Sequence, residues 1–457
     1  MSGNQRACSR YDRRRFLYRA VGACVAPAFV PAACLGRDGV TAPSNRIGVA
    51  AIGLGFAWDT ALYLPETRLV AVCDVLRERR EQARRAVNAH YGTEDCTAYN
   101  DFREVLARKD VDAVYIATPD HWHALITIAA ARAGKDIYCQ KPLTHSVAEG
   151  RAVVEAVRRS GVVLQHGTQH RSEWAFQAAR ELIRRGYLGQ LKTIRLGLPA
   201  GTQLPPQPTQ PVPDGFDYDL WLGPAPWTPF TSRRCFGVHS WYFISDYCVG
   251  YIAGWGVHHL DSGQHGHGAD DTGPVRIRSR AIFPTDGLYD TPIHYRVDYE
   301  YADGVTMIAT DVSDGGWSQG AGIHPDRIRE VHGDAYQRHT FGVRFEGDEG
   351  SLFVWRGGRL DTAPASLRQL VAHDAPKTEV PNTTLDHFRN WVECIHTRRD
   401  PAAPVEVGHR STTLCNIGTI SMVLGRELAW DPVTETFPHD AEANRLLACR
   451  IRSPWQL

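Results

Sequence analysis

Short apolar runs alternate with amphipathic stretches in the part of the chain that follows residue 46. The apolar runs cover residues 47–55, 68–75, 111–118 and 136–142. The stretches between these runs have the length or the residue spacing of helices; they are residues 60–64, 76–90, 102–107 and 123–133. Continuous apolar strands that alternate with helices are typical of a parallel sheet covered on both faces. The pattern therefore predicts a Rossmann-type domain.

The second half of the chain has another pattern, in which apolar and polar residues alternate with a period of two. Such runs, separated by turn residues, occur at 191–200, 273–284, 293–312 and 340–360, and helical spacing returns at 387–397 and 409–425. Residues 199–229 are rich in proline and cannot form a central strand, so we interpret them as a long ordered loop near the functional site. The glycine-rich, then charged segment 313–340 is a second candidate lid.

The first apolar run ends in a Gly-Leu-Gly turn of the kind that binds dinucleotides. Gly53 permits the turn, and Gly55 lets the backbone approach a pyrophosphate at a helix N-terminus. Phe56, Ala57 and Trp58 follow, so the third glycine of the usual pattern is missing. That glycine serves helix packing rather than phosphate contact. Trp58 is therefore predicted to displace the first helix or shift its start without removing the site.

A carboxylate stands at the end of the second apolar run. Asp74 follows Gly55 by 19 residues, close to the spacing at which an acidic side chain binds the adenosine ribose hydroxyls. This carboxylate favours NAD, because it would repel a 2′-phosphate. Arg77, Arg79 and Arg80 keep NADP as the alternative.

The N-terminus has adjacent arginines before an apolar segment. Residues 12–17 read Asp-Arg-Arg-Arg-Phe-Leu, and a weakly apolar run follows at 20–36. This is typical of a twin-arginine export signal, and a basic tail is the alternative. The run is shorter than the roughly 20 residues that a membrane span needs, and it contains two prolines. We predict a signal over residues 1–35, a linker over 36–45 and a periplasmic or otherwise exported protein without a membrane span.

Composition narrows the function to small-molecule chemistry. The 457 residues are 43% hydrophobic, enough for two domains with buried cores. Lys+Arg and Asp+Glu both number 51, so no net field attracts nucleic acid or an anionic membrane. The cysteines beyond residue 35 are widely spread and form no CxxC pair, which argues against structural zinc. Buried thiols and disulfides both remain open.

Six stretches carry a resemblance to the Gfo/Idh/MocA oxidoreductases, of the exported, twin-arginine type. They span nearly all of the predicted mature chain in the order that the family has. They are VDAVYIATPDHWHALITIAAARAGKDIYCQKPLTHSVAEG at 111–150, GTQHRS at 167–172, DYDLWLGPAP at 217–226, GWGVHHLD at 254–261, RFEGDEGSLFV at 344–354 and PVEVGHRSTTLCNIG at 404–418.

The resemblance implies a fold of two domains. An NAD(P)-binding Rossmann domain with a parallel sheet would occupy residues 46–165. A domain with an open, predominantly antiparallel sheet would occupy 166–435, with a late helix returning to the first domain, and 436–457 would form a tail. In such folds one face of the open sheet finds a partner subunit, so a homo-oligomer is expected.

The resemblance also assigns roles to residues. Lys141 matches the family lysine that holds the reacting oxygen near the nicotinamide, and a desolvated lysine can share in proton transfer. His258 matches the second proton carrier, whose ordinary pKa near neutrality suits acid and base roles. With the turn and Asp74, the predicted cofactor-binding set is Gly53, Gly55, Phe56, Ala57, Asp74, Thr118, Pro119, His123, Gln140 and Lys141.

One position departs from the family pattern. Gly254 stands where the family has an aspartate, four residues before His258, so another group must orient the substrate or tune the histidine. The predicted substrate-binding set is Gln169, Arg171, His259 and Asp261. His258, Asp261 and His265 would share one helical face and could hold a divalent ion. A histidine-rich helix that binds a polyhydroxy substrate explains the same residues, and we predict no metal.

These observations together predict an exported NAD(P)-dependent oxidoreductase of a sugar, cyclitol or glycoside. Twin-arginine transport moves folded proteins, so the cofactor can be loaded in the cytoplasm, and it should then stay bound and be restored in each cycle. One alternative is an NAD-dependent glycosidase that works by transient oxidation, elimination, hydration and re-reduction. The second is a catalytically silent sugar-binding protein that kept the fold after losing the aspartate at position 254.

Overall fold

The computed structural model describes residues 45–237, 240–312, 324–333, 341–371 and 383–457. The chain divides into two units, residues 1–46 and residues 47–457, and the second contains both sheets. The predicted signal, all but the last residue of the predicted linker, and residues 313–323 and 334–340 of the second candidate lid lie outside the described residues.

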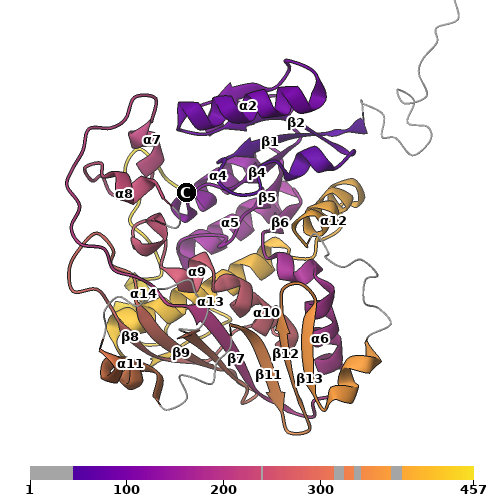
Figure 1. Cartoon of the computed structure of the whole chain (residues 1–457), viewed down its shortest axis with the longest axis vertical. Coiled ribbons are helices and arrows are strands. Elements are labelled where there is room, and N and C mark those ends of the chain that lie inside the picture. Colours follow the sequence, from indigo (N-terminus) through magenta and orange to yellow (C-terminus); the bar gives the residue numbers. More distant parts are fainter. Residues whose placement is uncertain (1–44, 238–239, 313–323, 334–340, 372–382) are drawn as a thin grey trace, which may run out of the picture. The chain divides into compact units, whose positions relative to one another are not determined.

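The first sheet has six strands, all parallel, in the order β3-β2-β1-β4-β5-β6 (Figure 1). Its strands are β1 (Ile47–Ile52), β2 (Thr67–Cys73), β3 (Thr97–Tyr99), β4 (Ala113–Ile116), β5 (Asp136–Cys139) and β6 (Leu164–His166). The four central strands are buried along almost their whole length, as the continuous apolar runs predict. The predicted Rossmann-type architecture is confirmed.

Helices cover both faces of this sheet. One face packs against α3 (Phe102–Leu106), α4 (Asp120–Arg132) and α5 (Val147–Ser160). The other face packs against α2 (Arg77–Tyr91) and α12 (Thr383–Thr397), which brings Phe388 and Trp391 from the far end of the sequence into this core. Ser146 caps α5 through a capping box with Glu149, which fixes the start of the helix that follows Lys141.

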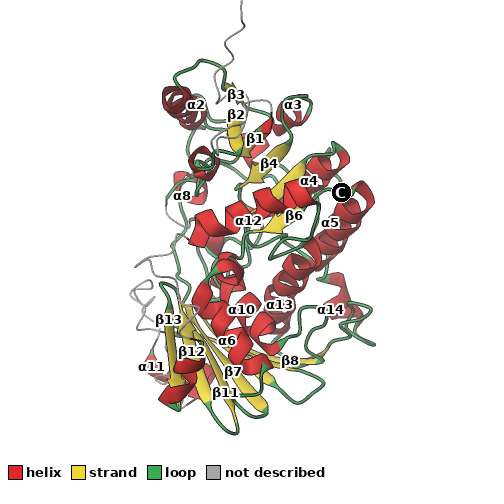
Figure 2. Ribbon diagram, turned by 90° about the vertical axis from the view of Figure 1, so that its right-hand side faces the viewer, coloured by secondary structure: helices red, strands yellow, loops and turns green. Residues whose placement is uncertain are grey.

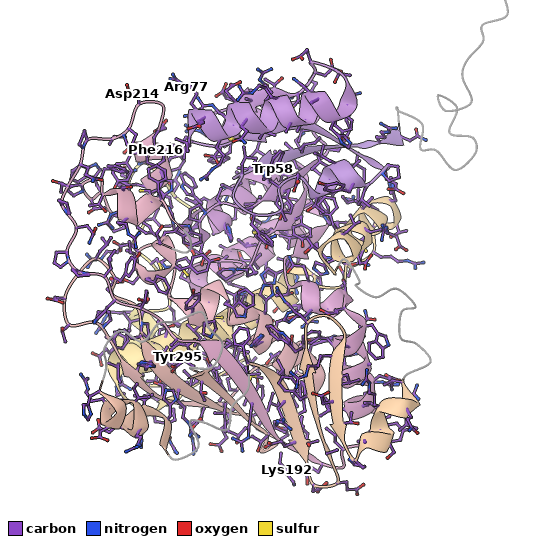
Figure 3. The ribbon with its side chains drawn as sticks, viewed as in Figure 1. Trp58, Arg77, Lys192, Asp214, Phe216 and Tyr295 are labelled. Atoms are coloured by element: carbon purple, nitrogen blue, oxygen red, sulfur yellow. The ribbon has the colours of Figure 1, made fainter. Side chains whose placement is uncertain are left out.

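The segment after β1 differs from the usual Rossmann pattern. No α-helix follows the Gly-Leu-Gly turn; a single 3-10 turn, η3 (Thr60–Tyr63), stands in its place. Ala57 has a positive φ of 49°, and Trp58 packs at the edge of the core beside α12 (Figure 3). The missing glycine therefore shortens the first helix rather than displacing it. A pyrophosphate at this turn would meet backbone N–H groups without the dipole of a long helix.

The second sheet has eight strands in the order β13-β12-β11-β7-β10-β9-β8-β14 (Figure 1). Its strands are β7 (Leu191–Pro199), β8 (Arg276–Ile282), β9 (His294–Glu300), β10 (Thr306–Val312), β11 (Gly342–Gly347), β12 (Ser351–Trp355), β13 (Arg359–Ala363) and β14 (Leu428–Ala429). Among the described residues of this sheet, β10 and β7 pair in parallel and the other neighbouring strands pair in antiparallel. The prediction that the second domain contains a predominantly antiparallel sheet is confirmed.

One face of the second sheet packs against three helices, as Figure 2 shows. These are α6 (Trp174–Arg184), α10 (Val257–His267) and α13 (Val405–Leu424). Tyr295 of β9 belongs to this core and donates from its hydroxyl to Pro199 O over 3.1 Å. Helix α13 also packs against α5 of the first domain. Because α10 lies between the second sheet and the first domain, it can carry side chains to the junction.

The described residues between 230 and α10 contain α8 (Ser232–Cys235), η5 (Trp241–Phe243) and α9 (Tyr251–Gly254). The proline-rich segment 199–229, which precedes them, is an ordered loop with one short helix, α7 (Tyr218–Leu222). It reaches the first domain at residues 214–217, where Gly215 O accepts from Arg77 N over 2.8 Å (Figure 3). Asp217 Oδ2 accepts from Asn100 Nδ2 over 2.7 Å. The loop therefore runs beside the carboxyl ends of the Rossmann strands, where ligands bind in such sheets.

Among the described residues, no helix is long and apolar enough to cross a membrane. The cysteines of the described chain are free thiols, and most of them are buried. Helix α11 (Pro325–His332) occupies the described part of the second candidate lid and packs against β8 and β9.

Candidate active site

A cavity of about 930 Å³ lies at the carboxyl ends of the Rossmann strands, between the two domains of residues 47–457. Its volume is at the upper end of the range of small-molecule sites. The predicted residues that line it are Gly53, Gly55, Phe56, Asp74, Thr118, Pro119, His123, Gln140, Lys141, Gln169 and His258. One cavity thus joins the glycine turn to both predicted catalytic residues.

The glycine turn leaves room for a ligand where the sequence predicts it. Gly53 has a φ of +82°, and a Cβ there would stand 2.6 Å from the backbone of Ala117. Gly55 lines the cavity, and a Cβ there would have no neighbour nearer than 4.0 Å. The first glycine is therefore required by the fold, and the second opens the backbone to the cavity. Ala57, predicted to contact cofactor, is not part of the lining.

Asp74 lines the cavity beside the glycine turn. Its carboxylate accepts from Leu54 N over 3.1 Å and from Leu76 N over 2.9 Å, which fixes its orientation. Arg79 also lines the cavity and lies 3.5 Å from Asp74 Oδ2. Arg80 turns away and donates to Asp74 O and Asn100 Oδ1. A carboxylate held at this point is suited to a pair of ribose hydroxyls.

Replacing Asp74 by Asn is expected to weaken NADH binding by roughly 10-fold, because hydrogen bonds to a charged group contribute about 1.5–3 kcal/mol and the amide keeps part of the geometry. NADPH binding should fall less, since the charge that opposes a 2′-phosphate is removed. Fluorescence titration of nucleotide-stripped protein measures both. Asp112→Asn is the matched control, because Asp112 accepts from Gly48 N at the opposite end of β1. Equal losses in both variants would refute the assignment.

The middle of the cavity is built by residues after β4 and β5. Gln140 Nε2 donates to Tyr115 OH over 2.6 Å, and that hydroxyl donates to Phe56 O over 3.1 Å. His123 bridges Thr118 O and Pro142 O, at 2.8 and 2.6 Å. These hydrogen bonds join the segments that follow β4 and β5. His123 therefore fixes this wall of the cavity as well as lining it.

Lys141 follows β5 and enters the cavity from the first domain. Its Nζ donates to Gly254 O at short range and to Tyr242 OH over 3.4 Å. Burial lowers the pKa of Lys141, and the carboxyl of Asp120 opposes this shift. The amine is thus anchored at two points and its charge is easier to remove than that of a surface lysine.

Asp120, the first residue of α4, is a buried carboxyl that also lines the cavity. Burial raises the pKa of Asp120 to about 7, against the opposing effects of Cys248 and Lys141. The carboxyl of Asp120 therefore gains or loses its proton near neutral pH. This change in charge alters the pKa of Lys141. The sequence contains Asp120 in the Pro-Asp-His-Trp-His stretch, but no spacing rule marked it.

Replacing Asp120 by Asn is expected to shift the alkaline limb of the pH profile of kcat/KM to lower pH. The ionised carboxyl favours the ammonium form of Lys141, whereas the amide cannot, so the lysine of the variant loses its proton at lower pH. Steady-state rates from pH 5 to 10 for both proteins measure the shift. An alkaline limb unchanged in Asp120→Asn would show that Asp120 does not support the charge of Lys141.

His258 lies on α10 and lines the cavity from the second domain. Burial lowers the pKa of His258 well below its ordinary value, and the positive charge of Arg356 lowers it further. The pKa of His258 in the folded protein is therefore well below the ordinary value on which its predicted acid and base roles rest. Its neutral imidazole can accept a proton, but the lowered pKa makes it a weaker base than an exposed histidine.

Three predicted substrate-binding residues lie behind the cavity wall. Arg171 Nε donates to both oxygens of Asp261, at 3.0 and 2.9 Å, and its Nη atoms donate to Asp270. His259 Nδ1 bonds to Gly197 O over 2.9 Å. Asp261 and His259 are fully buried and Arg171 nearly so, and none lines the cavity. The prediction that Arg171, His259 and Asp261 contact substrate is corrected: they fasten α10 to its neighbours. Gln169 does line the cavity.

The polar clusters are spaced for hydrogen bonds rather than for metal. Arg171 occupies the side of Asp261 and His265 at which an ion would bind. A second cluster, on the second sheet, has Asp311 2.7 Å from His294 Nδ1 and 2.9 Å from His332 Nε2. Two ligands of one tetrahedral zinc ion lie about 3.4 Å apart, from bonds of about 2.1 Å. The cluster instead fixes α11 to β9 and β10.

The structure adds cavity residues that the sequence analysis did not select. Besides Asp120 they include Tyr242, Trp255, Trp241, Trp221, His170 and Arg356. Most of them lie in short helical turns, and Arg356 lies in a hairpin turn, where no periodic pattern marks a side chain as functional. Aromatic rings beside hydrogen-bonding groups are typical of sites that bind small polar ligands.

A Rossmann domain with a glycine turn and Asp74, joined by one cavity to a lysine and a histidine, defines the class of dinucleotide-binding oxidoreductases. Residues 47–168 match the model of an oxidoreductase family with an NAD-binding Rossmann fold, and residues 200–318 and 345–457 match the C-terminal alpha/beta domain of the same family. The chain belongs to the Gfo/Idh/MocA oxidoreductase family.

Curated relatives match about a third of the chain. The scyllo-inositol 2-dehydrogenase (NAD(+)) of Bacillus subtilis is 35% identical over 144 residues, which are 32% of this chain and 40% of the relative. The levoglucosan dehydrogenase of Pseudarthrobacter phenanthrenivorans is 33% identical over 157 residues, 34% of this chain and 38% of the relative. This chain therefore spans less than half the length of these relatives.

Solved structures share the whole fold at low identity. The aldose-aldose oxidoreductase from Caulobacter crescentus, complexed with glycerol, has a TM-score of 0.58 at 18% identity, covering 84% of this chain and 99% of the other. The WlbA dehydrogenase from Bordetella pertussis, in complex with NADH and UDP-GlcNAcA, has a TM-score of 0.61 at 16% identity, covering 85% and 98%. At this identity the likeness establishes the fold of both domains and nothing finer.

Proposed function

We propose that this protein is an NAD-dependent oxidoreductase that acts on a sugar, cyclitol or glycoside. The observation that carries the proposal is the single cavity that runs from the glycine turn and Asp74 to Lys141 and His258. Family membership supports a nicotinamide cofactor, and the names of the related inositol and levoglucosan dehydrogenases support a polyhydroxy substrate.

The residues of the cavity fit a nicotinamide dinucleotide. The open backbone at Gly55 suits a pyrophosphate, Asp74 suits the adenosine ribose, and Gln140 and Lys141 stand where the far end of the cofactor would lie. A nicotinamide bound there supplies the hydride acceptor. The chain itself has to hold the substrate hydroxyl and remove its proton.

Lys141 and His258 divide that task. The ammonium of Lys141, held by Gly254 O and Tyr242 OH, donates to the reacting oxygen and stabilises the negative charge that develops on it. His258, kept neutral by its lowered pKa, takes the hydroxyl proton. As the O–H bond breaks toward His258, the C–H pair leaves as hydride and the C=O bond forms.

NAD is the proposed form of the cofactor, because the fixed carboxylate of Asp74 opposes a 2′-phosphate. Arg79, next to Asp74 and on the cavity wall, is the residue that would accept NADP if this assignment is wrong.

Export, cofactor retention and assembly are part of the same proposal. The arginine pair near residue 13 supports a twin-arginine route to the periplasm. A protein that crosses folded can carry its cofactor, and retention follows because no nicotinamide pool exists outside to exchange with. The second sheet supports a homo-oligomer formed through that domain.

The test is to denature purified, host-processed protein and to identify the released nucleotide and its redox state. Stoichiometric NAD or NADH supports a retained cofactor, and an empty pocket that refuses added dinucleotide refutes it. Deuterium exchange at a sugar carbon in the intact protein then separates an enzyme from a silent sugar-binding protein. Release of a reducing sugar from a glycoside without an added acceptor would identify the NAD-dependent glycosidase instead.

A further inference from the structure

Arg356 is a cation on the cavity wall that no part of the sequence analysis marked. It lies in the turn between β12 and β13 and lines the cavity together with Lys141 and His258. Its guanidinium lies over the ring of Trp255, 4.9 Å from the centroid, and Trp255 packs edge-on against His258. The cation–π contact orients Arg356 at the catalytic end of the cavity.

The hydrogen-bond partner of Arg356 is uncharged. Its Nε donates to His170 Nε2 over 2.8 Å, so that nitrogen carries no proton. His170 Nδ1 then donates to Ser262 Oγ over 3.0 Å, and Ser262 donates to His258 O over 2.7 Å. The chain of donors fixes His170 as a neutral imidazole, in agreement with its lowered pKa, which burial causes. The positive charge of Arg356 is therefore not neutralised by the group that holds it.

The terminal nitrogens of Arg356 are the free edge of the guanidinium. Within the described chain the hydrogen bond of Arg356 uses Nε, and no carboxylate forms an ion pair with the guanidinium. Glu173 is the carboxylate that attracts it electrostatically, but Glu173 is buried behind the wall and accepts from Gly358 N over 2.9 Å. Burial lowers the pKa of Arg356, the effect expected of a cation that has lost water without gaining a counter-ion.

We propose that Arg356 binds a carboxylate of the substrate and that the substrate is a sugar acid, such as a hexuronate or a glycoside of one. This rests on the proposed oxidoreductase function and names the substrate class of that same site. The two Nη atoms offer the parallel donors that a planar carboxylate accepts in a bidentate pair. Lys141, held elsewhere, stays available for the hydroxyl that reacts.

A bound carboxylate would also improve His258 as a proton acceptor. Arg356 is the first of the charged groups that lower the pKa of His258. A carboxylate on Arg356 offsets that charge, and the pKa of His258 then rises toward the range in which an imidazole is an effective base. A neutral sugar cannot do this, so the acid group contributes to the reaction as well as to binding.

The experiment uses the intact protein with its nucleotide, whose occupancy is measured first. Glucuronate, galacturonate and mannuronate are each compared with glucose, galactose and mannose, and with the corresponding hexose phosphates, by calorimetry and by nicotinamide absorbance. The proposal expects binding or turnover of at least one uronate and at least 10-fold weaker response to its neutral partner. A neutral sugar that responds as well as its acid, a response to phosphates alone, or no response to any acid would overturn it.

Matched variants locate the anion. For the responding uronate, Arg356→Gln should raise KM roughly 10- to 100-fold, the loss expected for a hydrogen-bonded charge pair, and Arg356→Lys should recover part of it. Arg359→Gln removes the same charge from an exposed position of the same hairpin and should leave KM unchanged. Equal KM values in Arg356→Gln and Arg359→Gln would overturn the assignment. Missing nucleotide in the starting protein would instead count against the oxidoreductase itself.

Discussion

Replacing Lys141 by Met is expected to abolish most turnover while the protein keeps its nucleotide. The Nζ atom is the donor placed between Gly254 O, Tyr242 OH and the cavity, and methionine fills similar space without a proton or a charge. Loss of a positioned acid–base group lowers rates by roughly 100- to 10,000-fold. Asp74 and the glycine turn are untouched, so dinucleotide binding should persist. The measurements are turnover and nucleotide released on denaturation, from the same preparation.

Lys135 provides the control for this substitution. It precedes β5, as Lys141 follows it, and its Nζ donates to Arg108 O and Val111 O, at 2.9 and 2.7 Å, far from the cavity lining. Lys135→Met should lower thermal stability with little effect on turnover. If Lys141→Met kept more than a tenth of the parent activity at full nucleotide occupancy, Lys141 would not hold the reacting oxygen.

The two sheets could be predicted because each has a strong periodic signal. Continuous apolar runs encode strands buried on both faces. β1, β4 and β5 fall within the runs that the sequence marks, and β2 begins one residue before its run. The turn after β1 could not be predicted in the same way. A missing glycine indicates that the helix is disturbed, but whether it moves, shortens or disappears depends on packing around Trp58 and α12 that no local pattern contains.

The site was predicted in part, for a geometric reason. Motif matches selected Lys141 and His258, and both line the cavity. Neighbours of His258 were then selected by proximity in sequence. His259 faces β7, because successive helical residues point about 100° apart. Asp261 is three residues after His258, but Arg171 binds its carboxylate behind the cavity wall. Proximity along a helix does not determine which side chains share a cavity.

Arg356 is a cavity residue that the sequence did not predict. It lies about a hundred residues after His258 in the sequence, in a turn whose Trp-Arg-Gly-Gly-Arg letters signal only a hairpin. Its position next to His170 and Trp255 arises from the pairing of β11, β12 and β13 with β7. The environment that lowers the pKa of His258 is likewise a property of the folded cavity, because burial and a distant cation cause it.

The glycine at position 254 has a physical explanation in the ring of Tyr242. A Cβ at residue 254 would stand 2.4 Å from Tyr242 Cδ2 and 2.5 Å from Cε2, closer than carbon atoms approach without displacement. The tyrosine thus occupies the space that a longer side chain would need, and its hydroxyl contacts Lys141. An aspartate at this position and the tyrosine at 242 exclude each other.

Gly254→Asp is therefore expected to destabilise the protein by about 2 kcal/mol, within the range for overpacked sites, and to lower its melting temperature. The packing around Tyr242 makes this substitution destabilising. At an open helical position, replacing glycine would instead stabilise the protein by about 0.5–1 kcal/mol. Gly254→Ala adds the Cβ atom without a charge, so it measures the effect of the overlap alone. It should show much of the loss of stability. Differential scanning fluorimetry of the nucleotide-loaded proteins measures the shifts.

The double variant Tyr242→Ala/Gly254→Asp distinguishes this explanation from a general intolerance of residue 254. Removing the ring makes room for the carboxylate, so the two changes should be coupled, and the double variant should be more stable than the sum of the single effects implies. The carboxylate would then approach the Nζ of Lys141 and raise its pKa. Additive losses would show that Tyr242 is not what requires a glycine at this position.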